Sequence, residues 1–103
     1  MPAWTVDDSV QRQKYDKNKH IPVPAAAMEK YFEWRRKITQ ENLHPKEAAK
    51  KVGDTHYEPL NGEHKGEFTI RINQEHRVAF TIDDDKKTVN VFVVGGHYPP
   101  SKK

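Results

Sequence analysis

The sequence contains no cysteine. A disulfide framework and a thiolate metal site are therefore excluded. Long hydrophobic runs are missing too: Val91–Val94 is as long as any purely aliphatic or aromatic run, whereas a membrane-spanning helix needs about 20 apolar residues. The first eight residues lack the basic and apolar regions of a secretion signal. We therefore expect a protein of the reducing cytoplasm with no membrane segment.

Apolar residues are scarce for a folded domain. Only 34% of the 103 residues are hydrophobic, 32% are charged, and the mean hydropathy is -1.04. A chain of this composition folds only if its apolar side chains gather on a few faces. The length predicts one domain, residues 1–103. We expect a helical part at about residues 6–53, a sheet part at about 57–98 and a short basic tail at 99–103.

The charge is modestly positive and unevenly placed. The net charge is +3 and the isoelectric point is about 9.1. Residues 1–56 carry 11 basic against 8 acidic side chains, and residues 57–103 carry 7 against 7. Such a balance is compatible with a polyanionic partner, because clustered cations release counterions from phosphates. It does not require one.

Three helices are predicted in the first half. A weak capping box, Thr5 with Asp8, favours a short helix over residues 6–16. Helical spacing of apolar residues predicts a longer helix from Pro24 to about Asn42. Pro45 and Gly53 predict the start and the end of a third helix. The apolar residues of the long helix are Ala27, Met28, Tyr31, Trp34 and Ile38.

The second half changes to a period of two, which predicts strands. Three alternating segments form a meander with polar hairpins at 73–75 and 83–87, and Tyr57–Leu60 and Pro2–Thr5 are possible edge strands. The predicted class is α+β, with N-terminal helices on one face of a small antiparallel sheet and the opposite face open. The apolar positions expected to face the helices are Phe68, Ile70, Ile72, Val78, Phe80, Ile82, Val89, Val91 and Val93.

Two arginines are then expected on the open face. Arg71 and Arg77 alternate with the apolar positions, so both should project away from the helices. A pair of guanidinium groups is a candidate phosphate clamp, because each offers a planar fork of donors. The simpler interpretation is that both arginines are solvated side chains of the sheet, and alternation alone does not distinguish this interpretation from the phosphate clamp.

Sequence motifs around these arginines resemble the RelE/ParE toxin superfamily, and within it the YoeB-type ribosome-dependent mRNA endoribonucleases. The resemblance covers about residues 57–98. Its motifs are Tyr57-Glu58-Pro59-Leu60-Asn61-Gly62, Gly66-Glu67-Phe68-Thr69-Ile70-Arg71-Ile72, Glu75-His76-Arg77-Val78-Ala79-Phe80 and His97-Tyr98, with a looser match at Trp4-Thr5-Val6-Asp7-Asp8-Ser9.

The resemblance implies an active site and a reaction. Glu58, Arg77, His97 and Tyr98 occupy the catalytic motif positions, and Arg71 would position the phosphate. RNA carries its own nucleophile in the 2′-hydroxyl, so cleavage needs a base, cations for the developing charge and an acid for the departing oxygen. Glu58 would be the base and His97 the acid, and no metal or other cofactor is expected.

Two further residues are candidate substrate contacts, and some features depart from the pattern. Asn61 replaces a lysine common in the family, which removes one phosphate contact; Asn61 and Lys65 remain the candidates in this loop. Residues 99–103 follow the His-Tyr pair, which in the family lies near the chain end. A three-histidine metal site involving His56 and His64 matches no known spacing.

The implied partners are mRNA, the 30S ribosomal subunit with its rRNA, and a cognate antitoxin protein. Two other functions stay open. One is a ParE-like inhibitor of DNA gyrase, and the other is a catalytically inactive interaction protein of the same fold. The combination of Glu58, Arg77 and His97 favours the nuclease, because a gyrase inhibitor needs no acid and base beside a phosphate clamp.

Overall fold

A computed structural model of the chain describes residues 3–10 and 22–96. The described elements are β1 (Thr5–Asp7), α2 (Ala25–Thr39), α3 (Pro45–Val52), β2 (Glu58–Pro59), the 3-10 turn η1 (Gly62–His64), β3 (Glu67–Arg71), β4 (Arg77–Asp83) and β5 (Thr88–Val94). None of the helices in these two ranges is long and apolar enough to cross a membrane.

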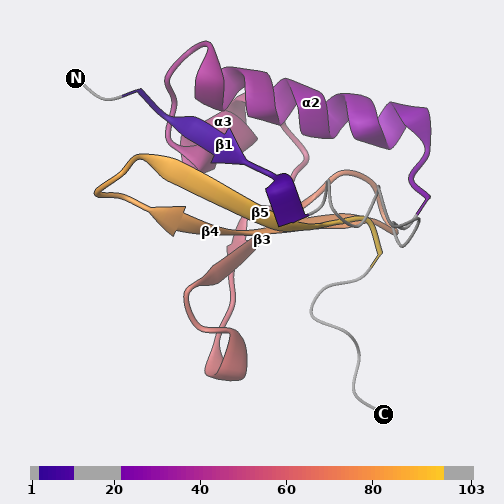
Figure 1. Cartoon of the computed structure of the whole chain (residues 1–103). Helices are drawn as coiled ribbons and strands as arrows, with labels where there is room; N and C mark the ends of the chain where they lie inside the picture. Colours follow the sequence, from indigo (N-terminus) through magenta and orange to yellow (C-terminus); the bar gives the residue numbers. More distant parts are fainter. Residues whose placement is uncertain (1–2, 11–21, 97–103) are drawn as a thin grey trace.

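The strands form one five-stranded sheet in the order β1-β5-β4-β3-β2. The four strands β2 to β5 are antiparallel neighbours, as the meander predicts, and β1 pairs with β5 in parallel, so the sheet is mixed. The helices α2 and α3 lie on one side of it, and the β2–β3 loop extends on the other side (Figure 1). The α+β class with an open sheet face is therefore confirmed.

The N-terminal prediction needs a correction. Val6 and Asp7, expected in a helix over residues 6–16, lie in β1, where Val6 pairs with Val89. Strand pairing gives this segment backbone partners and packs Val6 against the core, which outweighs a weak local cap. Helical conformation begins only at Ser9, and residues 11–16 of the predicted helix lie outside the described residues.

The long helix forms where its apolar spacing predicts. Its buried residues are Ala27, Tyr31, Trp34 and Ile38. It begins after Pro24 and ends at Thr39, three residues before the expected Asn42. Asn42 has a positive φ of 58°, a conformation that asparagine tolerates and that a helix excludes. The chain therefore reverses there, and the Asn42 side chain accepts a hydrogen bond from the Trp4 backbone at 2.8 Å.

The α3 helix confirms its predicted limits, Pro45 and Gly53. Proline occupies the first turn, and the side chain of His44 caps the helix by accepting a hydrogen bond from the Lys46 backbone at 3.0 Å. Gly53 ends the helix with a φ of 83°, which glycine adopts without steric cost.

Trp34 is the centre of the core between helix and sheet. Its side chain is fully buried, its ring lies 4.9 Å from that of Phe80, and its indole N–H donates to the Pro45 carbonyl at 3.1 Å. One side chain therefore ties together α2, the start of α3 and β4. The remaining core residues include Ile38, Ile70, Val78, Val89, Val91 and Val94.

The predicted alternation of β5 is wrong in its last third. Val91 pairs with Phe80 and Val93 pairs with Ala79, so Phe92 is an extra residue in the strand. This β-bulge shifts the phase of the side chains. Val94 is buried in the core instead of Val93, which turns to the open face.

Tyr57 makes the stability of the protein depend on pH in the alkaline range. Its ring stacks on Phe68 at 5.6 Å, and burial, with a smaller contribution from Asp84, raises the pKa of its phenol above 10.0. The folded chain keeps the phenol proton at pH values where the unfolded chain has lost it. Stability is therefore retained below the unfolded pKa and falls as the pH rises above it.

We expect the free energy of unfolding to fall more steeply in the wild type than in Tyr57→Phe between about pH 9 and 11, where tyrosines titrate. Urea unfolding of both proteins at matched pH measures this difference, because the other titrating groups are common to the two. Parallel pH profiles would contradict the assigned burial of the Tyr57 phenol.

Candidate functional site

The register of β3 and β4 fixes where the two arginines point. Arg71 is the direct partner of Arg77, and the neighbouring pair Ile70 and Val78 is fully buried under the helices. Successive side chains of a strand alternate between faces. Arg71 and Arg77 therefore lie side by side on the sheet face without helices, which we call the open face, in agreement with the sequence alternation.

The two guanidinium groups repel each other. Like charges directly opposite across a strand pair are destabilising. The pKa of Arg77 is lowered, first by burial and then by Arg71, while Glu58 acts in the opposite direction. The Arg77 side chain is also held by the β3–β4 hairpin, since its Nη1 donates to the carbonyls of Gln74 at 3.3 Å and Asn73 at 3.5 Å. A bound anion would relieve the repulsion on an already oriented fork.

Glu58 lies on the same face of the sheet. In β2 it pairs with Thr69 of β3, and Thr69 is two residues from Arg71, so both share the open face. Its side chain is 56% exposed, and it acts electrostatically on Arg77. The fold thus brings Glu58, Arg71 and Arg77 together from three strands.

His56 is a site neighbour that the sequence analysis considered only as a metal ligand. Its Nε2 lies 3.6 Å from Oε1 of Glu58, and its backbone has a φ of 48°. This left-handed backbone departs from an extended strand, so strand alternation does not predict the approach of His56 to Glu58. At this distance the His56 imidazole is close enough to orient the Glu58 carboxylate.

The predicted residues His97 and Tyr98 lie outside the described residues. The described chain before them ends beside Arg77. The Arg77 backbone donates to Gly96 at 2.9 Å and accepts from Gly95 at 2.8 Å. The Gly96 N–H donates to Nδ1 of His76 at 2.8 Å, and His76 is 8% exposed. His76 is thus largely buried, and its hydrogen bond to Gly96 fixes the backbone next to Arg77.

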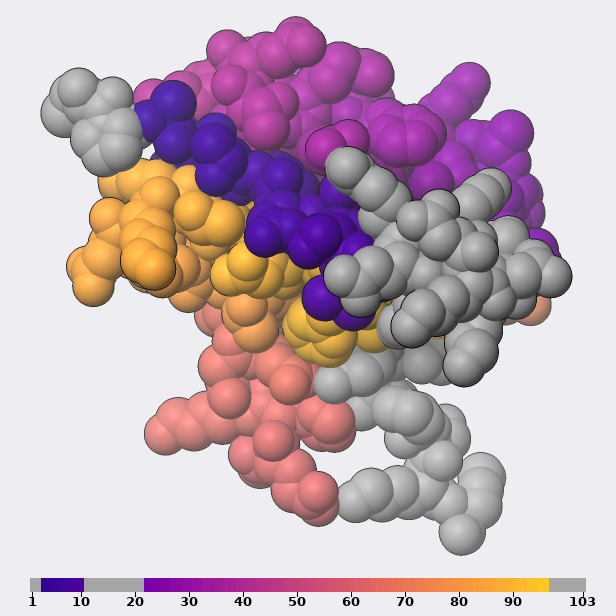
Figure 2. All heavy atoms as spheres, in the orientation of Figure 1, coloured from indigo at the N-terminus to yellow at the C-terminus, as the bar shows by residue number. Residues whose placement is uncertain are grey.

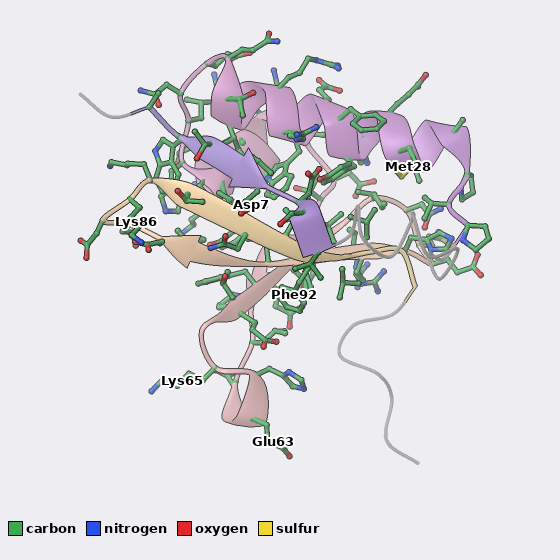
Figure 3. The ribbon with its side chains drawn as sticks, in the orientation of Figure 1. Asp7, Met28, Glu63, Lys65, Lys86 and Phe92 are labelled. Carbon is green, nitrogen blue, oxygen red and sulfur yellow. The ribbon has the colours of Figure 1, made fainter. Side chains whose placement is uncertain are left out.

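Asn61 and Lys65 are not brought to the arginines. Both belong to the β2–β3 loop, which stands out from the body of the molecule (Figure 2). Lys65 lies near its tip with Glu63 (Figure 3). Lys65 precedes β3 and Arg71 ends it, so the strand separates them by roughly 15–20 Å. If Asn61 and Lys65 contact the substrate, they would therefore contact a part of a bound RNA away from the phosphate held by Arg71 and Arg77.

No metal centre is found in the described part of the chain. Within residues 3–10 and 22–96, no group of three or more histidine, aspartate or glutamate side chains could hold an ion. His56 and His64 pair with different carboxylates: His56 faces Glu58 at 3.6 Å, and His64 contacts Glu67 at 3.0 Å. The two histidines are therefore parts of separate pairs and do not converge.

Comparison with known proteins identifies the fold. No protein-family model matches the sequence, and no curated protein matches it significantly. Among solved structures, the toxin–antitoxin complex RelBE2 of Mycobacterium tuberculosis aligns with a TM-score of 0.57 and 21% identity over 94% of both chains. A YoeB/ParE toxin from Agrobacterium tumefaciens gives 0.56 and 22% over 95% of this chain and 100% of that one.

The YoeB dimer of Staphylococcus aureus has a TM-score of 0.54 and 20% identity, over 94% of this chain and 98% of that one. This chain has the RelE/YoeB toxin fold. The fold resemblance to the RelE/ParE superfamily, stated from the motifs, is confirmed over nearly the whole chain, including the first half, where the sequence resemblance is weak. In this toxin fold, Glu58, Arg71 and Arg77 lie on the sheet face that the helices leave open.

Proposed function

We propose that the protein is the toxin of a type II toxin–antitoxin system and a ribosome-dependent endoribonuclease that cleaves mRNA in the ribosomal A site. The observation that carries this proposal is a carboxylate and two guanidinium groups on the open face of a RelE/YoeB toxin fold. An acid–base group beside a phosphate clamp fits strand cleavage at a phosphodiester.

The proposed reaction is an in-line attack of a 2′-hydroxyl on the adjacent phosphorus. Glu58 accepts the hydroxyl proton as the O2′–P bond forms, and the P–O5′ bond breaks. The products are a 2′,3′-cyclic phosphate and a 5′-hydroxyl end. His97, assigned from the His-Tyr motif, supplies the proton to the departing 5′-oxygen, and Tyr98 stacks on a base or hydrogen-bonds the RNA backbone.

Each described residue has one task in this reaction. Arg77, held by the hairpin carbonyls, stabilises the charge that develops on the phosphoryl oxygens, and Arg71 positions the phosphate. His56 orients the Glu58 carboxylate. Asn61 and Lys65, on the projecting loop, contact the strand away from the scissile phosphate. The chain needs no cofactor in this scheme.

The proposed partners are mRNA, the 30S subunit with its rRNA, and a cognate antitoxin. Two of the similar structures are toxin–antitoxin complexes, RelBE2 and YoeB–YefM. A surface depression along α2 supports a protein partner here as well. It combines Phe32, 42% exposed, with Arg35 and Arg36, which offers an apolar anchor and two cations to an acidic segment. The proposed site of action is the cytoplasm.

Expression of the protein without an antitoxin tests the proposal. We expect bacterial growth to stop and primer extension to find cuts in translated mRNA, with neither effect for the Glu58→Gln and Arg77→Ala double variant. Growth arrest with intact transcripts and altered DNA topology would favour the gyrase inhibitor. Normal growth with intact transcripts would favour the inactive interaction protein.

A further inference from the structure

The linker between α3 and β2 holds His56 in an uncommon backbone conformation. Asp54 and His56 have positive φ angles of 53° and 48°, and Thr55 between them is 3% exposed. The Thr55 hydroxyl donates to the Ala49 carbonyl at 2.8 Å, which ties the linker to α3. Left-handed non-glycine residues are uncommon and cluster at functional sites. The buried anchor at Thr55 therefore fixes His56 in a conformation that the chain would otherwise disfavour.

The linker also places His56 at the level of Arg71. The Arg71 N–H donates to the carbonyl of Thr55, the residue directly before His56. Neighbouring strands lie about 5 Å apart, so the backbone of His56 runs beside Arg71, and Arg71 in turn is the direct partner of Arg77. One imidazole and two guanidinium groups thus come from three neighbouring segments.

The His56 side chain lies on the same side as the arginines. Its Nε2 is 3.6 Å from Oε1 of Glu58, and Glu58 acts electrostatically on Arg77. The His56 side chain is 60% exposed. An anion bound by Arg71 and Arg77 can therefore approach the imidazole from solvent.

A phosphate at this site meets a carboxylate as well as cations. Ionised Glu58 repels a bound phosphodiester, whereas Arg71 and Arg77 attract it. Histidine is the side chain whose charge ordinarily changes between about pH 5 and 8. A proton on His56 places a further cation beside the carboxylate and gives the phosphate oxygens another N–H donor. A bound phosphate therefore favours the protonated imidazole.

We infer that His56 is a third phosphate-binding residue of this site, that it binds RNA as an imidazolium, and that RNA binding therefore takes up a proton from solvent. The inference rests on the proposed function, because that function assigns RNA to the arginine pair. It gives His56 a contact with the ligand in addition to its contact with Glu58. Since the protonated form binds more tightly, the affinity for RNA falls as the pH rises through the range in which histidine titrates.

The other charged groups around His56 keep their charge in this range. Carboxylates, ammonium and guanidinium groups ordinarily titrate outside about pH 6 to 8. These groups are Glu58 of β2, Arg71 of β3, Arg77 of β4, Asp54 of the linker, and Lys30 of α2, whose Nζ donates to the Asp54 carbonyl at 3.4 Å.

A role limited to orienting Glu58 makes a different prediction. A neutral imidazole can hold a carboxylate in place, and RNA binding would then take up no proton at His56. Two substitutions separate the roles. His56→Asn is neutral, and asparagine tolerates a left-handed backbone. His56→Lys carries a fixed charge, and this chain already places a lysine, Lys87, at a φ of 54°.

The test is isothermal titration calorimetry with a short, fully 2′-O-methylated oligoribonucleotide, which has no free 2′-hydroxyl and cannot be cut. Titrations in two buffers of different ionisation enthalpy measure the protons taken up on binding. We expect the wild type to take up protons near neutral pH and to bind about three- to tenfold more tightly at pH 6 than at pH 8.

The variants should respond differently. His56→Asn should take up fewer protons than the wild type and bind at pH 6 as weakly as the wild type does at pH 8. His56→Lys should keep the tighter binding at both pH values. The matched control is His64→Asn, because His64 contacts Glu67 at 3.0 Å on the projecting loop; its proton uptake should equal that of the wild type. Thermal unfolding of each variant checks that the fold is intact.

Equal proton uptake by the wild type and His56→Asn overturns the inference, as does wild-type affinity that is independent of pH or a failure to bind the probe. The remaining histidines are common to both proteins, so the difference in uptake belongs to His56. Because the probe cannot be cut, the result is independent of cleavage. Proton uptake through His56 with translated mRNA left intact would support the inference while the proposed cleavage fails, and cleavage without linked uptake would do the reverse.

Discussion

Replacing Arg77 by alanine is expected to lower the rate of mRNA cleavage by at least ~100-fold, the scale of losing one group that stabilises a developing oxyanion. Arg77 is the arginine whose guanidinium is oriented by the carbonyls of Gln74 and Asn73. Its loss leaves Arg71 to bind the phosphate alone. Single-turnover cleavage on ribosomes programmed with mRNA measures the effect on the chemical step.

The matched control is Arg36→Ala, which removes an equal charge from α2, away from the sheet. We expect it to retain the wild-type cleavage rate in single-turnover experiments at saturating protein. Thermal unfolding of Arg77→Ala checks that this variant is folded, because the change removes the repulsion with Arg71 together with the hydrogen bonds to Gln74 and Asn73. Wild-type cleavage by a folded Arg77→Ala variant would remove Arg77 from the active site.

Replacing Trp34 by alanine is expected to destabilise the protein by about 3–5 kcal/mol, the usual cost of truncating a large buried aromatic side chain. The change empties the space against Phe80 and removes the hydrogen bond to the Pro45 carbonyl. The total free energy of unfolding of a domain is about 5–15 kcal/mol, so the variant would be close to unfolding. Urea unfolding followed by circular dichroism measures the loss.

Phe32→Ala is the control on the same helix. Because Phe32 is 42% exposed, this substitution should lower the free energy of unfolding far less than Trp34→Ala. The free energy of unfolding of Trp34→Phe should lie between those of Trp34→Ala and Phe32→Ala, since phenylalanine keeps apolar volume but leaves the Pro45 carbonyl without its donor. Equal stabilities of Trp34→Ala and Phe32→Ala would contradict the placement of Trp34 at the centre of the core.

The sequence was most informative where local signals and packing agree. The α3 helix has proline at its start, glycine after its end and buried alanines between, and its limits are as predicted. The first segment shows the opposite case. Its local capping signal favours a helix at Val6, but pairing with β5 makes it a strand, and a partner more than 80 residues away along the chain leaves no local trace.

The open face could be predicted only in part. Alternation places Arg71 and Arg77 together because each is counted along a short, regular strand. The same counting fails after Phe92, since one extra residue in β5 changes the face of the side chains that follow it. Val93, which the bulge turns to the open face, was therefore assigned by the period to the set that faces the helices.

The loop residues show a second limit of sequence reasoning. Asn61 and Lys65 lie close to Glu58 in sequence, yet the β2–β3 loop carries them away from the arginines. Proximity along the chain does not become proximity in space when a loop projects from a sheet. His56 shows the converse, because it lies two residues before Glu58 and its side chain does reach Glu58, at 3.6 Å, through a left-handed backbone that the sequence does not signal.

The most direct test of the account is cleavage of an A-site codon whose scissile nucleotide carries either a ribose or a 2′-deoxyribose. The account predicts that wild-type protein cuts the ribose mRNA on the ribosome, leaving a 2′,3′-cyclic phosphate, and that the 2′-deoxy mRNA remains intact. Equal cutting of both, or no cutting of either while growth still stops, would contradict attack by the 2′-hydroxyl on the open face.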